Sequence, residues 1–185
     1  MSMITLAEYE SYSKEEQLSY KKRAFAEAVR YVQNGEYKDH VKMFFSSMHS
    51  EFWGHTFSLH FRKTNDDLIY RLVNEYHLKS ASTFKDRDAE VILRLLKELL
   101  LKEETKELVA TWMFAYPEEQ RFMVLQPAGR IIGRGFTKDQ AYDNNWKHGA
   151  IPCNEVCFVF VRDYLTHGFK LLSAYPEFDG MGESY

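Results

Sequence analysis

Apolar and polar residues follow a helical period over the first part of the chain. Ser13 and Glu16 form the S-x-x-E signature of a capping box, and Gly35 is a natural stop for the helix that begins there. Apolar residues recur at helical spacing between these signals, at Leu18, Phe25, Ala28, Val29 and Val32. A second, shorter helix is predicted from Tyr37 to about Met48. We interpret both helices as an N-terminal extension that packs against the rest of the protein.

Helical signals continue in the middle of the chain. Thr64 is followed by residues that suit the first turn of a helix, namely Asn65, Asp66 and Asp67. The segment Ser80–Phe84 (SASTF) is interpreted as a connector of small residues, after which Asp86 and Asp88 are expected to open a long helix. A further helix is predicted to end before Pro117.

The last third of the chain has the pattern of strands. Arg121–Gln126 is predicted to form one strand, and a turn of proline, alanine and glycine leads to a returning strand at Arg130–Phe136. Thr137–Pro152 is expected to be a long polar loop, and Asn154–Arg162 and Gly168–Tyr175 are expected to form a hairpin. Helices followed by strands with short connections predict an α+β fold with an antiparallel sheet.

The composition is that of an ordinary globular protein. Of the 185 residues, 45% are hydrophobic and 28% are charged, which excludes a mostly disordered chain, a collagen and a coiled-coil rod. No apolar run approaches the ~18 residues of a membrane span, and Met1–Tyr20 is too polar to hold the core of a signal peptide. The net charge of -3 excludes a global positive field, so any nucleic-acid site would be a local basic patch.

The reactive residue types show no metal or cofactor signature. Cys153 and Cys157 are four residues apart in an expected strand, a span of ~13 Å, whereas a disulfide needs Cα atoms within about 7 Å, so we predict free thiols. The seven histidines show no metal-binding spacing, and the chain has no phosphate-binding loop, nucleophile elbow or dinucleotide fingerprint. Gly133–Gly135 is interpreted as a glycine-kinked strand. We therefore expect no metal and no cofactor.

Basic residues are concentrated in two stretches. Four cations and no acidic residue lie between residues 121 and 138, namely Arg121, Arg130, Arg134 and Lys138. Arg62 and Lys63 follow His60 almost directly. Either stretch alone is typical of a solvated face, but together they would suit a cationic groove for a polyanion.

Several short motifs occur in an order that resembles a known family. They are GHTFSLHF at Gly54–Phe61, the helix start at Thr64, SASTF, a long helix, Trp112, the G-R-G strand and the terminal LLSAYP. In order and spacing they are similar to the bacterial RNase A-like toxin domain at the C-termini of contact-dependent growth inhibition (CdiA) proteins. The similarity covers roughly Phe52–Phe178.

The resemblance implies an active site built from distant parts of the chain. In the family, a histidine is followed eleven residues later by an arginine, and a T-x-Y-P motif in the last strand supplies a hydroxyl and a tyrosine. The matching residues are His60, Arg71, Ser173 and Tyr175. Ser173 stands where threonine is usual but keeps the hydroxyl, and it shares a strand face with Tyr175. Candidate substrate contacts are Arg134, Thr83 and Arg130.

The activity that the resemblance implies is that of a metal-independent endoribonuclease, RNase A-like in fold but without disulfides. The 2′-OH would attack the adjacent phosphate and leave a 2′,3′-cyclic phosphate and a 5′-hydroxyl end. His60 would act as general base or acid, while Arg71 and Ser173 hold the phosphate. Tyr175 would assist by donating to the phosphate, by stacking on a base or as the second acid–base group. Residues 1–50 would form a helical extension and residues 51–185 the toxin domain.

Partners and location follow from the same resemblance. We expect RNA as substrate, a cognate immunity protein, a monomeric free protein and action in the cytoplasm of a target bacterial cell, with the export route left open. Two alternatives are a non-catalytic RNA-binding or protein-interaction module that uses the same groove, and a structural protein that docks through its first helices. A third, a nuclease of a different fold, requires His60 and Tyr175 to lie far apart.

Overall fold

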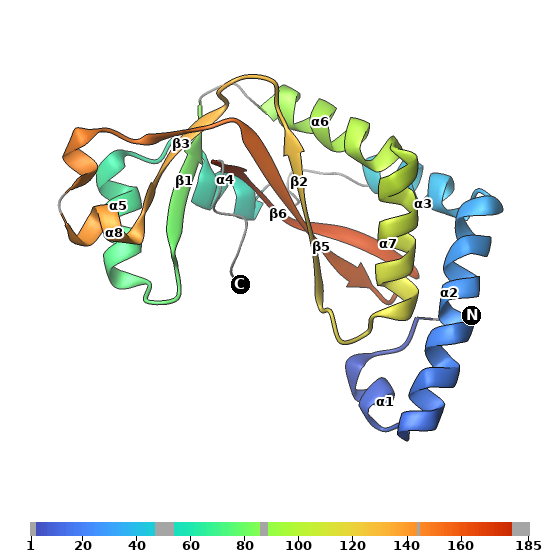
Figure 1. Cartoon of the computed structure of the whole chain (residues 1–185). Coiled ribbons are helices and arrows are strands. Elements are labelled where there is room, and N and C mark those ends of the chain that lie inside the picture. The colour runs from blue at the N-terminus through green and yellow to red at the C-terminus, as the bar shows by residue number, and fades with distance from the viewer. Residues whose placement is uncertain (1–2, 47–53, 86–88, 144, 179–185) are drawn as a thin grey trace. The chain divides into compact units, whose positions relative to one another are not determined.

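The computed structural model describes residues 3–46, 54–85, 89–143 and 145–178, and its helices and strands are labelled in Figure 1. The fold is α+β, as predicted, with two three-stranded antiparallel sheets in the orders β1-β3-β4 and β2-β5-β6. The chain divides into two compact units, and each of them brings together segments that are distant in sequence.

The first unit comprises Met1–Glu51, Lys97–Met123 and Val159–Leu172. Its helices are α1 (Leu6–Glu10), α2 (Lys14–Gln33), α3 (Glu36–Ser46) and α7 (Glu103–Ala115). The predicted capping box opens α2: the Ser13 hydroxyl accepts from the backbone N–H of Glu16, and the Glu16 carboxylate accepts from that of Ser13. Gly35 follows the helix at φ 81°, a conformation that favours glycine. The predicted helix is confirmed at both ends.

The buried face of α2 is formed largely by residues other than the apolar ones that indicated the helix. Leu18, Phe25 and Val29 are 58%, 41% and 55% exposed. The buried positions are Tyr20, Ala24, Ala28 and Tyr31. The Tyr20 hydroxyl donates to the carbonyl oxygen of Phe114 in α7, at 2.5 Å. Tyrosine is buried here because its ring packs in the core while its hydroxyl finds an acceptor.

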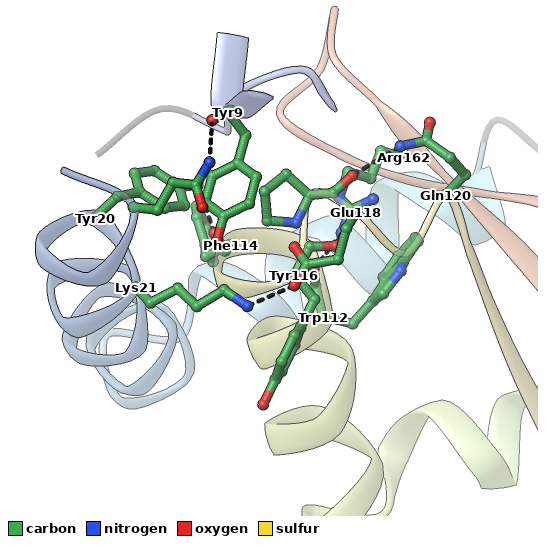
Figure 2. Close-up of polar contacts among 11 residues, drawn as sticks. Tyr9, Tyr20, Lys21, Trp112, Phe114, Tyr116, Glu118, Gln120 and Arg162 are labelled. Carbon is green, nitrogen blue, oxygen red and sulfur yellow. Dashed lines mark hydrogen bonds and ion pairs between the residues drawn. The ribbon is translucent and has the colours of Figure 1, made fainter. Parts of the chain in front are cut away.

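Arg162 holds the end of α7 within this unit, as Figure 2 shows. Its guanidinium group lies 4.5 Å from the centroid of the Trp112 ring. It donates to four main-chain carbonyl groups, those of Trp112, Met113, Tyr116 and Glu119. The carbonyl groups in the last turn of a helix lack partners within the helix, and Arg162 supplies donors to two of these, Trp112 and Met113, as well as to two carbonyl groups just beyond the helix. Arg162 is therefore a structural cation.

The second unit comprises Phe52–Leu96, Val124–Phe158 and Ser173–Tyr185. It holds α4 (Gly54–His60), α5 (Asn65–Asn74), β1 (Ser80–Phe84), β3 (Gly133–Thr137), α8 (Lys138–Tyr142), the 3₁₀ helix η2 (Asn145–His148) and β4 (Ile151–Cys153). Four elements contribute residues to both units: α6 (Ala89–Leu101), β2 (Arg121–Pro127), β5 (Glu155–Asp163) and β6 (Gly168–Glu177). Figure 1 shows α5 and α8 beside β1 and β3, where Leu68, Leu72 and Phe136 form a buried cluster.

The segment SASTF is a strand, so its interpretation as a connector is wrong. It forms β1 and pairs antiparallel with β3, with Ser82 opposite Gly135. A Cβ atom at Gly133 would lie 2.6 Å from the Thr83 carbonyl oxygen, and one at Gly135 would lie 2.8 Å from that of Ala81. Glycine is therefore needed at these two positions of β3, because the backbone of β1 comes too close to leave room for a side chain.

The predicted hairpin between Arg121–Gln126 and Arg130–Phe136 does not form. The two segments give strands, β2 and β3, but these belong to different sheets. The chain between them bonds to the last residue of β4 and to the residue after it, because Ile132 donates its N–H to the Cys153 carbonyl and Ala128 donates its N–H to that of Asn154. Each of the two strands pairs with strands distant in sequence instead of with the other, so β2 lies beside β5 and β3 lies between β1 and β4.

The predicted polar loop at Thr137–Pro152 contains three elements, so this prediction is also wrong. α8 begins with a capping box in which the Thr137 hydroxyl accepts from the Gln140 backbone N–H. η2 follows it, and β4 then pairs antiparallel with β3. The Thr-x-x-Gln spacing is the sequence signal for this helix.

Other local predictions are confirmed. Thr64 caps α5, where its hydroxyl accepts from the backbone N–H of Asp67 and the Asp67 carboxylate accepts from that of Thr64. β5 and β6 are neighbours in their sheet. Cys153 and Cys157 are free and buried.

Some predictions fall where the structure gives no description. The predicted helix opening at Asp86 and Asp88 and the predicted helix end at Met48 lie outside the described residues. Within the described ranges, every helix is too short or too polar to cross a membrane.

Candidate active site

His60 and Tyr175 are brought into contact within the second unit. His60 is the last residue of α4, and Tyr175 lies on β6. Their ring centroids are 5.4 Å apart, with an angle of 31° between the ring planes. The helix is tied to the strand because the backbone N–H of Ala174 donates to the Thr56 hydroxyl at 3.0 Å. The third alternative, which requires these two residues to lie far apart, is excluded by this contact.

Arg71 lies against the residue that precedes His60. Its Nη1 donates to the Leu59 carbonyl oxygen at 3.4 Å, and its Nε pairs with the Glu75 carboxylate at 3.0 Å. The Arg71 side chain is 16% exposed, so the guanidinium group is held at the edge of the protein interior. The eleven-residue spacing thus brings the cation on α5 next to the end of α4.

Ser173 and Tyr175 occupy alternate positions on β6, and both are buried. The Ser173 hydroxyl is buried without a hydrogen-bond partner in the described part of the chain. Its hydroxyl therefore keeps the capacity to bond a further polar group.

The surroundings of Tyr175 perturb two further groups. Burial raises the pKa of the Cys157 thiol to about 11, and a hydrogen bond from Tyr175 opposes that rise. Burial also raises the pKa of Glu177 to about 7, with a smaller contribution in the same direction from Glu155, while the Phe178 N–H opposes it. Glu177 follows Tyr175 by two residues on the same strand. Because burial raises both of these pKa values, the end of β6 is a poorly solvated environment.

Thr83 stabilises the turn that follows His60. Its fully buried hydroxyl donates to the His60 carbonyl oxygen at 3.1 Å and accepts from the backbone N–H of Lys63 at 3.1 Å. Beside it, Phe61 forms a β-bridge with Phe84, and their ring centroids are 5.0 Å apart. The hydroxyl is thus committed to the backbone of the turn.

Arg134 lines a cationic pocket next to this turn. Its Nε donates to the Asn65 side-chain oxygen and its Nη2 to the Lys63 carbonyl oxygen, both at 3.0 Å. The pocket has a volume of about 450 Å³ and is lined by Arg62, Lys63, Thr64, Phe84, Lys85 and Arg134. Three of the six cations that the sequence pattern placed in a groove are therefore brought together here.

The other predicted cations lie elsewhere. Arg121 belongs to the first unit. The Lys138 ammonium group donates to the Tyr76 carbonyl oxygen at 2.7 Å, and Arg130 is exposed between β2 and β3. Lys85 was missed because a single lysine after a strand of small residues gives no charge cluster to detect. Among the described residues, no three histidine, cysteine, aspartate or glutamate side chains gather to hold a metal ion.

Comparisons with known proteins agree with the motifs. Residues 54–176 match the family model of the bacterial CdiA-CT RNAse A domain. A solved structure, the crystal structure of a CdiA-CT/CdiI complex from Y. kristensenii 33638, is similar with 17% identity and a TM-score of 0.49, over 64% of this chain and 94% of that chain. No curated protein matches the chain. The match over residues 54–176 establishes that the chain belongs to the bacterial CdiA-CT RNase A family of ribonuclease toxin domains.

Proposed function

We propose that this protein is a metal-independent endoribonuclease toxin that cleaves RNA through the 2′-OH of the substrate. The observation that carries the proposal is the contact of the His60 and Tyr175 rings, at 5.4 Å, with Arg71 bonded to the residue before His60. An acid–base group, a guanidinium group and a phenol thus occupy one small region. These are the groups that phosphodiester cleavage without a metal needs.

In the proposed reaction, the 2′-oxygen attacks the adjacent phosphorus and the bond to the 5′-oxygen breaks. The products are a 2′,3′-cyclic phosphate and a 5′-hydroxyl. His60 transfers a proton at one of the two oxygens, either from the 2′-OH or to the departing 5′-oxygen. Arg71 donates two parallel hydrogen bonds to the phosphate oxygens, where negative charge increases in the transition state.

The two residues of β6 support the phosphate and the imidazole. The Ser173 hydroxyl, which has no partner among the described residues, donates to a phosphate oxygen. Tyr175 fixes the plane of the His60 ring through their contact and assists proton transfer or phosphate binding with its hydroxyl. Both act from a strand, which holds its side chains more firmly than a loop does.

The remaining candidate residues act around this centre. Thr83 is a positioning residue, because its hydroxyl bonds the backbone on both sides of the turn after His60. Arg134 and Arg130 contact the RNA backbone outside the scissile group. The sugar-phosphate chain, rather than the base sequence, is what such cations recognise.

The biological setting of the proposal follows from its chemistry. RNA is accessible in the cytoplasm of a target bacterial cell, and the producing cell must restrain such an enzyme, so a cognate immunity protein is the expected partner. We further propose that the free protein is a monomer, with residues 1–50 as a helical extension and residues 51–185 as the toxin domain.

Incubation of the purified protein with total RNA in excess chelator tests the proposal. Cleavage should persist, and His60→Ala should lower the rate by about 10²–10⁴-fold, the usual contribution of a general acid–base group. His148→Ala is the matched control, because His148 is an exposed histidine in the same unit. Loss of cleavage with chelator, or equal cleavage by the two variants, would refute the mechanism.

A further inference from the structure

A cationic pocket lies beside the turn that follows His60. The pocket of about 450 Å³ beside this turn has six lining residues, of which four are cations, namely Arg62, Lys63, Lys85 and Arg134. None of these lining residues is acidic, in a protein whose net charge is -3. The volume is within the range of about 300–1,000 Å³ that is typical of ligand sites.

The pocket is held in shape by hydrogen bonds from three separate segments. Arg134 of β3 donates to the carbonyl oxygen of Lys63, which fixes the guanidinium group against the turn. Lys85, at the end of β1, donates its backbone N–H to the Ile132 carbonyl at 3.0 Å. The Thr83 hydroxyl bonds both His60 and Lys63, so the pocket and the candidate active site share one clamp. A site held in this way is preorganised for its ligand.

The backbone of the turn carries an uncommon conformation. Arg62 adopts φ 54°, in the left-handed region that residues with a side chain rarely occupy. Such a residue persists only where its surroundings hold it, and such residues cluster at ligand clamps and active sites. In the sequence, Arg62 lies between His60 and Lys63. The uncommon conformation therefore falls at the point where the chain passes from the candidate active site to the pocket.

We propose that this pocket binds a second phosphate group of the RNA strand, next to the scissile one. The proposal rests on the proposed function and extends it from the reacting bond to the neighbouring nucleotide. Three residues of backbone, from His60 to Lys63, span at most about 10 Å, so the pocket is within reach of a strand whose scissile phosphate lies at His60. Arginine offers a planar fork to phosphate oxygens, and lysine adds a point charge.

The consequence is a preference for substrate length. An RNA that carries a phosphate on the pocket side of the scissile bond gains the pocket contacts, whereas a dinucleoside monophosphate has only the scissile group and gains none. The pocket should therefore raise kcat/KM for oligonucleotides and leave the cleavage of the dinucleoside monophosphate unchanged.

The test is the double variant Lys63→Gln/Lys85→Gln. Its matched control is Lys79→Gln/Lys147→Gln, which removes two exposed lysines of the same unit away from the pocket. Binding of a single-stranded RNA with 2′-O-methyl groups, which cannot be cleaved through its 2′-oxygens, is measured by fluorescence anisotropy across a range of salt concentrations. Cleavage of an unmodified oligonucleotide and of a dinucleoside monophosphate is measured in parallel.

We expect the double variant to bind more weakly and to reduce the slope of log K against log salt by up to about 0.7, the contribution of one lost phosphate contact on a single strand. Its kcat/KM should fall for the oligonucleotide and stay unchanged for the dinucleoside monophosphate. The unchanged value also shows that the variant is correctly folded. A slope and an oligonucleotide kcat/KM equal to those of the control would overturn the subsite. If the wild-type protein binds the RNA with a steeper slope of log K against log salt than the double variant and yet cleaves no RNA, the subsite stands and the proposed nuclease function fails.

Discussion

Replacing Thr83 with valine should loosen the turn that links the candidate active site to the cationic pocket. Valine has nearly the shape of threonine but no hydroxyl. The change removes the acceptor for the Lys63 N–H and the donor for the His60 carbonyl, both bonded at 3.1 Å. A buried backbone group that loses its partner costs about 1–3 kcal/mol. Because His60 is only partly buried and water can reach the turn, we take the lower end for each group, or about 2 kcal/mol in total.

The catalytic effect of this change should exceed its effect on stability. A loss of about 2 kcal/mol leaves a domain with 5–15 kcal/mol of stability folded at room temperature. A shift of about 1 Å in a catalytic group, however, can lower the rate by about 10²-fold. We therefore expect Thr83→Val to remain folded while kcat/KM for RNA falls by at least about tenfold.

Urea unfolding and RNA cleavage, measured on the same preparations, check both effects. Thr83→Ser is the control, because serine keeps the hydroxyl and loses only a methyl group. The valine variant should be less stable and less active than the serine variant. If the two variants are equal in both measurements, the hydroxyl does not hold the turn and the reasoning is wrong.

Two further changes follow from the same geometry. Arg71→Lys keeps the charge but loses the planar fork, so kcat/KM should fall by about tenfold to a hundredfold in a cleavage assay, and a variant as active as the parent would contradict bidentate binding. Burial raises the pKa of Glu177 to about 7 from its usual 4.5, so the folded state binds a proton that the unfolded state has released, and stability falls as the pH rises from about 4.5 through 7. Glu177→Gln removes this penalty of up to about 3 kcal/mol, so urea unfolding should show a gain over the parent at pH 8 that disappears near pH 4, and a gain independent of pH would contradict it.

The elements that could be predicted from the sequence are those determined by residues close together in the chain. The capping boxes at Ser13 and Thr64 act over three residues, and the structure has a helix beginning at each of them. The face that a helix buries depends on its partners, and α2 buries two tyrosines whose inward position no local pattern indicated. The position of this helix could therefore be predicted from the sequence, whereas the face that it buries could not.

Strand pairing was harder to predict because it depends on distant partners. Ser80–Phe84 is buried from Ala81 onward, so it lacks the alternation of apolar and polar residues that marks a half-exposed strand. β2 and β3 are consecutive in the chain, yet their partners lie in different sheets. The glycines of β3 could have indicated a close approach of backbones, which is what they permit.

The candidate site was predictable only in part from the residues alone. The shared strand face of Ser173 and Tyr175 follows from the period of a strand. The contact of Tyr175 with His60 joins a helix end to a strand far along the chain, and only the order of the family's motifs indicated it. Lys85 had no signal of its own, because its role depends on where β1 ends.

The most direct test of the central claim is the fate of one RNA oligonucleotide with a mapped cleavage site, compared with the same strand that carries a 2′-deoxy nucleotide on the 5′ side of that site. The account predicts a 2′,3′-cyclic phosphate and a 5′-hydroxyl from the first strand, and no cleavage at that position in the second. Continued cleavage of the 2′-deoxy strand there, or products that carry a 3′-hydroxyl and a 5′-phosphate, would contradict attack by the 2′-OH and with it the assigned roles of His60, Arg71 and Tyr175.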